Sequence, residues 1–189
     1  QVGVFRLEQL QSLFELACSK EEPCGRAAAM AIGNLAVIGK NQIQMARQGA
    51  LPPLINLLAS KYTSCQQYAA RALYRLSANV DNQVRIVEAG VLPPLISLAQ
   101  SPDLDCKRCA AMTLCNLATN VDNQGHIVSA GGLPPIIALL ESVSVECQRY
   151  ACMTLCNLAT NTANQRHIVK QGALQPLIAL IMSDDADCQ

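Results

Sequence analysis

The sequence lacks several features that would point to familiar classes of protein. It has no tryptophan, two phenylalanines and four tyrosines in 189 residues, so its core must come from Leu, Ile, Val, Ala, Met and Cys. So few aromatic rings leave no stacking platform for single-stranded nucleic acid. Basic and acidic residues balance at 14 each, which argues against a general nucleic-acid binder. No run reaches the ~20 apolar residues of a membrane span.

Motifs that carry catalysis or hold a cofactor are also missing. There is no Gly-rich phosphate loop and no nucleophile elbow. The two histidines, His126 and His167, occupy one position of a repeat, where a surface or inter-repeat contact is expected. Cys106 and Cys109 have metal-like spacing but no second pair, so zinc is not expected. We predict no enzyme activity, no cofactor and no metal; an enzyme would need His, Cys and acid in one pocket.

The ten cysteines are interpreted as free thiols rather than as a disulfide framework. Five of them recur every 41 residues: Cys24, Cys65, Cys106, Cys147 and Cys188. Such a column is typical of a small buried apolar residue, and no secretory pattern accompanies it. A reducing, cytoplasmic location is therefore expected. A lipid anchor outside this segment, or a nuclear location, is compatible with the same sequence.

A 41-residue repeat organises the chain. The octapeptide Thr113–Asn120 returns letter for letter as Thr154–Asn161. Other columns keep this period without gaps, and they include a glycine column and a proline column. The glycines are Gly49, Gly90, Gly131 and Gly172, and the prolines are Pro53, Pro94, Pro135 and Pro176. Identical spacing over several columns predicts a stack of equivalent structural units with no single central core.

Each unit is predicted to contain three helices, of which the first is short. In one copy it spans Asn82–Ala89, with Asp81 as the expected N-cap, and Asp122 is the counterpart of Asp81 one repeat later. Gly90 ends this helix, because a left-handed residue is needed there and glycine adopts that conformation without strain.

The second and third helices follow. The second begins at the pair Pro93-Pro94, since proline suits a first turn, and turns Leu95, Ile96 and Leu98 inward. The third runs from about Cys106 to Ala118. Its apolar stripe at helical spacing is Cys106, Cys109, Ala110, Thr113, Leu114, Leu117 and Ala118. No alternation of period two occurs, so no strands are predicted.

We divide the chain into a single array of repeats, complete in the middle and partial at both ends. The boundaries are 1–40, 41–81, 82–122, 123–163 and 164–189. The array is expected to open inside a first helix, Val2–Leu7, and to close after a second helix, Leu174–Met182. A piece of a longer array is the expected explanation. Uncapped ends would show apolar surface, so a structural element that self-associates is an alternative.

This pattern resembles the armadillo repeat. Ala110–Ala118 and Ala151–Ala159 match Ala-x-x-x-Leu-x-Asn-Leu-Ala, and Gly90–Leu98 matches the preceding half of the repeat. The resemblance covers essentially the whole chain. The phrase Asn-Leu-Ala-Thr-Asn is most similar to vacuole-membrane and rhoptry-type armadillo scaffolds. The resemblance to the armadillo repeat implies an all-α protein that forms a right-handed α-solenoid, or superhelix. Its third helices would line a concave groove that binds extended peptides.

The resemblance also implies that an asparagine of each third helix bonds the backbone of the partner. This role carries over to Asn34, Asn116 and Asn157, but not to Arg75, which stands at the same position. The candidate face consists of residues four apart on the third helices. Its members are Arg26, Met30, Asn34, Gln67, Arg71, Arg75, Arg108, Met112, Asn116, Arg149, Met153 and Asn157.

Five arginines and no acid among these residues predict an extended, acidic partner segment. Three alternatives stay open. The asparagines could bridge neighbouring repeats, the arginines could form ion pairs on a solvated face, and the methionines could fill the core. A nuclear-import-type cargo adaptor is a weaker alternative. That group keeps a tryptophan where this chain has Met30, Arg71, Met112 and Met153, and arginines repel basic cargo.

Overall fold

The protein is helical throughout the described part of the chain. A computed structural model describes residues 7–182 and contains no strand in that range, which confirms the all-α prediction. Two compact units are present, the N-terminal unit of residues 1–94 and the C-terminal unit of residues 95–189. The division falls inside α7 (Leu92–Leu98).

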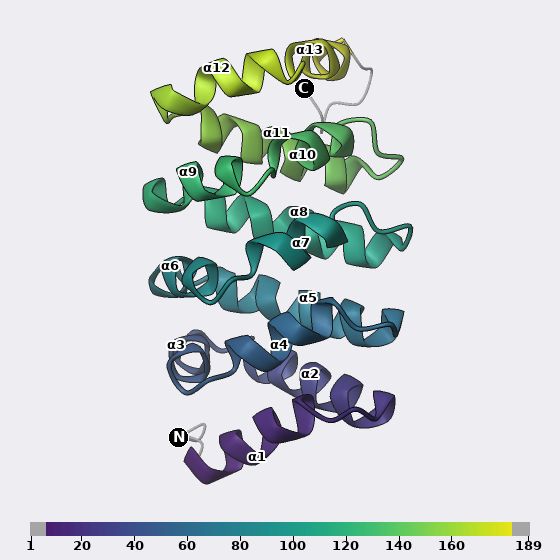
Figure 1. The fold of residues 1–189 in the computed structure, drawn as a ribbon, viewed down its shortest axis with the longest axis vertical. Helices are drawn as coiled ribbons and strands as arrows, with labels where there is room; N and C mark the ends of the chain where they lie inside the picture. The colour runs from purple at the N-terminus through teal and green to yellow at the C-terminus, as the bar shows by residue number, and fades with distance from the viewer. Residues whose placement is uncertain (1–6, 183–189) are drawn as a thin grey trace. The chain divides into compact units, whose positions relative to one another are not determined.

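The N-terminal unit is built around two long helices that lie side by side, α2 and α5 (Figure 1). Both occupy the third-helix position of the repeat, while α1 and α4 are second helices and α3 and α6 are first helices. The bounds are α1 Leu7–Ala17, α2 Glu22–Leu35, α3 Gly39–Arg47, α4 Leu51–Leu58, α5 Thr63–Ser77 and α6 Val80–Glu88.

The C-terminal unit repeats this arrangement, with α8 and α11 as the packed third helices (Figure 1). Here α9 and α12 are first helices, and α10 and α13 are second helices. The bounds are α8 Leu104–Ala118, α9 Val121–Ser129, α10 Leu133–Leu139, α11 Val145–Ala159, α12 Thr162–Lys170 and α13 Leu174–Ile181.

The glycine column ends the first helices as predicted. Gly90 has φ +85° and Gly131 has φ +81°, and the other two members of the column are left-handed as well. A Cβ built on either residue would meet nothing within 4 Å. The requirement for glycine therefore comes from the backbone conformation and not from crowding.

The predicted N-caps of the first helices were wrong. The helix α6 begins at Val80, and Asn79 caps it by accepting the N–H of Asp81 at 3.0 Å. Asn120 accepts the N–H of Asp122 at 2.9 Å in the same way. The asparagine at the end of each octapeptide thus supplies the capping oxygen, because its side chain lies on the open side of the first turn. The aspartates instead lie in that turn, where the helix dipole favours an acid.

Other helix ends differ from prediction by a few residues. The second helix begins at Leu92, so its prolines occupy the first turn rather than open it. The third helix begins at Leu104, where the Asp103 carboxylate accepts the N–H of Cys106 at 2.8 Å. The last described helix ends at Ile181, one residue before the predicted Met182.

The predicted opening helix, Val2–Leu7, mostly precedes the residues that the structure describes. Leu7 is described as the first residue of α1, and the rest of the predicted helix lies outside the described residues. Cys188 also lies outside the described residues. Of the predicted cysteine column, Cys65, Cys106 and Cys147 are buried, whereas Cys24 is half-buried.

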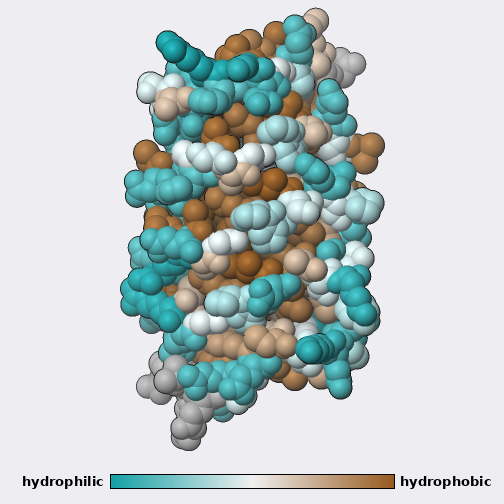
Figure 2. Space-filling model, viewed as in Figure 1, coloured by the Kyte–Doolittle hydropathy of each residue, from teal (hydrophilic) through white to brown (hydrophobic). Residues whose placement is uncertain are grey.

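The predicted inward stripe of the third helix is buried in full. Every member from Cys106 to Ala118 is at most 4% exposed, and Leu114 is fully buried. Ala111 and Cys115, which were not predicted, are buried beside them because α11 packs against this side of α8. In the space-filling view, apolar residues occupy the middle of the face shown and hydrophilic residues line its two sides (Figure 2).

A pair of amide side chains, an asparagine and a glutamine, joins each first helix to the third helix before it. Asn82 Nδ2 donates to Leu76 O at 3.0 Å, and Gln83 Nε2 donates to Ser77 O at 3.2 Å. The last carbonyls of a helix lack partners of their own, and these amides satisfy them. The asparagine bond, at 2.9–3.1 Å, recurs at Asn41, Asn82, Asn123 and Asn164. This asparagine column was not predicted from the sequence.

The nine described cysteines are free thiols, and their chemistry depends on burial. Burial, followed by the hydrogen bond and charge of Asp103, raises the pKa of Cys106 to about 12. Burial also raises the pKa of Cys115. Cys18 and Cys156 are exposed.

We predict that native protein treated briefly with a maleimide at about pH 8 is labelled at Cys18 and Cys156 but not at Cys106. Only a thiolate reacts, and the Cys106 thiol remains protonated and covered below its raised pKa. Peptide mass mapping measures the labelling of each cysteine. A urea-unfolded sample is the control, in which all three should react; equal labelling in native protein would contradict the prediction.

Candidate functional site

None of the twelve candidate residues is buried; each is exposed or half-buried. Met30 is 43% exposed and Met153 is 48% exposed, so core filling does not explain these two methionines. The candidates of α2 and α5 are called the α2–α5 face, and those of α8 and α11 are called the α8–α11 face. The two faces are chemically different.

On the α2–α5 face, Arg75 ties the two helices together. Its Nη1 donates to Gly33 O at 2.6 Å and to Asn34 Oδ1 at 3.3 Å. A Cβ on Gly33 would lie 3.5 Å from Ala72, so the helices pack closely at this point. The alternative that a candidate asparagine bridges repeats therefore holds for Asn34, whose oxygen already accepts a bond. Both acceptors of Arg75 are neutral, and Arg75 makes no ion pair among the described residues.

On the α8–α11 face, Arg108 lies between two carboxylates. Its Nη2 is 2.7 Å from Asp105 Oδ1 on its own helix, and its Nη1 is 3.0 Å from Glu146 Oε2 on α11. The hydrogen bond to Glu146 is the main cause of a raised pKa of Arg108. For Arg108, therefore, the alternative of an ion pair on a solvated face holds.

Asp105 and Glu146 were missed when the face was defined from columns of residues four apart. They occupy one repeat position, since 105 plus 41 is 146, and each lies three residues before an arginine of the face. The i,i+3 spacing of opposite charges on a helix was the available signal. The same position holds Pro23 and Ser64 in the N-terminal unit, and neither is charged.

The remaining arginines make no ion pair among the residues that the structure describes. The guanidinium of Arg71 is 5.9 Å from the centroid of the Tyr68 ring, and that of Arg149 is 5.1 Å from the Tyr150 ring. Contact with an aromatic face holds a guanidinium while its N–H groups can still reach an acceptor. Arg26 is exposed.

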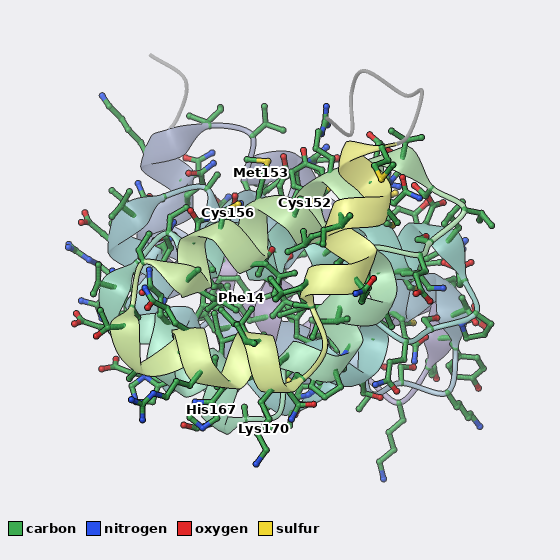
Figure 3. The ribbon with its side chains drawn as sticks, turned by 90° about the horizontal axis from the view of Figure 1, so that it is seen from above. Phe14, Cys152, Met153, Cys156, His167 and Lys170 are labelled. Carbon is green, nitrogen blue, oxygen red and sulfur yellow. The ribbon has the colours of Figure 1, made fainter. Side chains whose placement is uncertain are left out.

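His167 lies away from the candidate residue Met153 of the same unit. In the C-terminal unit, Met153 and Cys156 of α11 lie on one side, whereas His167 and Lys170 of α12 lie on the other (Figure 3). His126 and His167 are both exposed, and His167 Nδ1 is 3.1 Å from Ala163 O of its own helix.

Within the described range, no three His, Cys, Asp or Glu side chains are grouped so as to hold a metal. No described helix is long and apolar enough to cross a bilayer.

A family model for the armadillo/beta-catenin-like repeat matches residues 40–78, 79–119 and 120–160, which together make up more than half of the chain. The chain belongs to the armadillo repeat family. No curated protein matches the sequence. Its fold is accordingly the armadillo α-solenoid of three-helix repeats, as predicted.

Solved structures similar to this armadillo chain include engineered proteins. Computationally designed armadillo repeat proteins for modular peptide recognition match its fold at TM-score 0.90 and 24% identity, over 95% of this chain and 77% of theirs. A designed armadillo repeat protein in complex with the peptide (KR)4 matches at TM-score 0.87 and 26% identity, over 96% and 82%. An engineered protein matches at TM-score 0.90 and 30% identity, over 95% and 45%.

Proposed function

We propose that this armadillo protein is a scaffold that binds an extended, acidic segment of a partner protein in a groove lined by its third helices. The main support is the set of arginines that make no ion pair among the described residues: Arg26, Arg71, Arg75 and Arg149. A guanidinium forms two parallel bonds with a carboxylate, which suits such a partner.

Repetition of the third helix supplies the register for an extended chain. Neighbouring helices pack ~8–10 Å apart, and an extended peptide advances ~3.3 Å per residue. Each repeat therefore meets two or three partner residues. The amides of Asn116 and Asn157 are proposed to bond the partner's backbone. One such bond contributes about 0.5–1.5 kcal/mol, so affinity must come from several repeats acting together.

The sign of the charge is what we expect to distinguish this protein from the designed relative solved with (KR)4. That complex supports the general idea that this architecture holds a charged peptide. Because the α2–α5 face carries three arginines and one carboxylate, we expect it to repel a basic peptide. The nuclear-import-type alternative predicts the opposite preference, so (KR)4 is a useful competing probe.

We expect the pair Arg71→Glu and Arg149→Glu to weaken binding of a fluorescent acidic octapeptide at least about tenfold, or about 1.4 kcal/mol. Each substitution replaces an attraction by a repulsion on a third-helix face. Fluorescence anisotropy at low and at moderate salt measures the affinity, and added salt should weaken wild-type binding.

The matched control is the pair Arg85→Glu and Arg166→Glu, which changes the net charge equally on exposed first-helix positions of α6 and α12. It should weaken binding much less. If (KR)4 bound more tightly than the acidic peptide, or if both reversals acted equally, the proposal would be wrong.

Self-association is the second candidate function. Val169 of α12 is 54% exposed, and Leu174 and Ile178 of α13 are 50% and 49% exposed. Val169 and Leu174 line a hollow of about 300 Å³ together with Leu155 and Leu177 among others. Solution mass at rising protein concentration separates the two functions, since a peptide binder stays monomeric whereas an assembling element grows.

The closer grouping with vacuole-membrane and rhoptry-type armadillo scaffolds remains a proposal, based on the Asn-Leu-Ala-Thr-Asn phrase. We also propose a reducing compartment such as the cytoplasm for this protein. The free thiols of its described cysteines support that location.

A further inference from the structure

The two third-helix faces carry different net charge. The α2–α5 face has Arg26, Arg71 and Arg75, and one carboxylate, Glu22, lies four residues before Arg26 on α2. Glu22 accepts a bond from Ser64 Oγ at 2.7 Å and makes no ion pair with a described arginine. Three positive charges against one negative charge leave this face positive.

The α8–α11 face is neutral by the same count. It has two arginines, Arg108 and Arg149, and two carboxylates, Asp105 and Glu146. Both carboxylates contact Arg108, at 2.7 Å and 3.0 Å. The guanidinium of Arg108 therefore already donates to two carboxylates within the protein, whereas Arg149 makes no ion pair among the described residues.

Methionines stand next to this neutral charge cluster. Met112 follows Arg108 by one helical turn, and Met153 follows Arg149 in the same way. Met112 is half-buried and Met153 is 48% exposed. Thioether side chains are flexible and polarizable, and they adapt to apolar groups of different shape.

On the basis of the proposed function, we infer that Asp105 and Glu146 set the charge selectivity of the α8–α11 face by keeping further carboxylates away from Arg108. Each face, taken by itself, then selects its own kind of side chain. The α2–α5 face binds carboxylates, and the α8–α11 face binds an apolar side chain beside Met112 and Met153.

The deciding variant is the full chain with Asp105→Asn and Glu146→Gln, which keeps the shape of both side chains and removes their charge. Two fluorescent peptides of equal length serve as probes, one acidic throughout and one half acidic and half leucine. Wild type should bind the mixed peptide more tightly. The variant should gain about tenfold in affinity for the acidic peptide and prefer it, and adding Arg108→Gln should remove that gain.

Asp81→Asn with Asp122→Asn is the matched control, because these exposed acids lie on first helices and change the net charge equally. It should leave the wild-type preference in place. Circular dichroism checks that each variant is folded. If the double variant is not folded, single variants that change only Asp105 or only Glu146 replace it.

The outcomes separate the two proposals. If neither peptide binds wild type, the proposed function fails. If both peptides bind but the preference does not reverse in the variant, or if it reverses equally in the control, the inference about Asp105 and Glu146 is wrong while acidic-peptide binding stands. Reversal that depends on Arg108 supports the inference.

Discussion

Replacing Leu114 with alanine is expected to destabilise the protein by about 2–5 kcal/mol. Leu114 is fully buried on α8, where α8 packs against α11. Truncation removes apolar contact and leaves a cavity that neighbouring helices fill only in part. Urea unfolding followed by circular dichroism measures the change. Because each repeat is stabilised by its neighbours, the loss should appear as an earlier transition of the C-terminal unit.

Leu104→Ala is the matched control for this prediction. Leu104 opens the same helix but is 48% exposed. A surface change of this kind should alter stability by no more than about 0.5 kcal/mol. Equal unfolding midpoints for the two variants would mean that Leu114 does not carry the packing assigned to it.

Replacing Asn82 with leucine should have the second largest effect. The Asn82 amide is fully buried and donates to Leu76 O and to Gln42 O, both at 3.0 Å. Leucine has a similar size but no donor. Each carbonyl left without this bond costs about 1–3 kcal/mol. The loss should be visible as a lower urea midpoint and as faster amide hydrogen exchange at the end of α5.

Asn56→Leu provides the comparison, since Asn56 is an exposed asparagine on α4 in the same unit. It should leave the midpoint nearly unchanged. A loss of stability in Asn56→Leu as large as that in Asn82→Leu would show that adding leucine, rather than removing the bridging amide, is responsible.

Much of the fold was predictable because each position of the repeat can be compared with its three equivalents in the same chain. Gly90 and its column were predicted to be left-handed, and the structure confirms this. The buried stripe around Leu114 was also predicted correctly, since helical spacing alone separates inner from outer positions. Capping was predicted less well: Asp81 and Asn79 are both good N-caps, and only the backbone hydrogen bonds distinguish them.

The candidate site was predictable as a set of outward positions but not as a pattern of charge. From the sequence, Arg71, Arg75 and Arg108 were all predicted to have the same role, the binding of an acidic partner. The structure gives them a tyrosine ring, a backbone carbonyl and two carboxylates as respective partners. These partners come from neighbouring turns or from an adjacent repeat, so a count along one column does not reveal them.

The sequence by itself determined the family, the helical repeat and which side of each third helix faces outward, because these depend on periodic spacing within short segments. Only the tertiary structure decided which polar groups are already satisfied. Helix packing places Glu146 against Arg108, Arg75 against Asn34, and Asn82 against two carbonyls. Charge and hydrogen bonding act over a few ångströms, and those distances between repeats exist only in the folded chain.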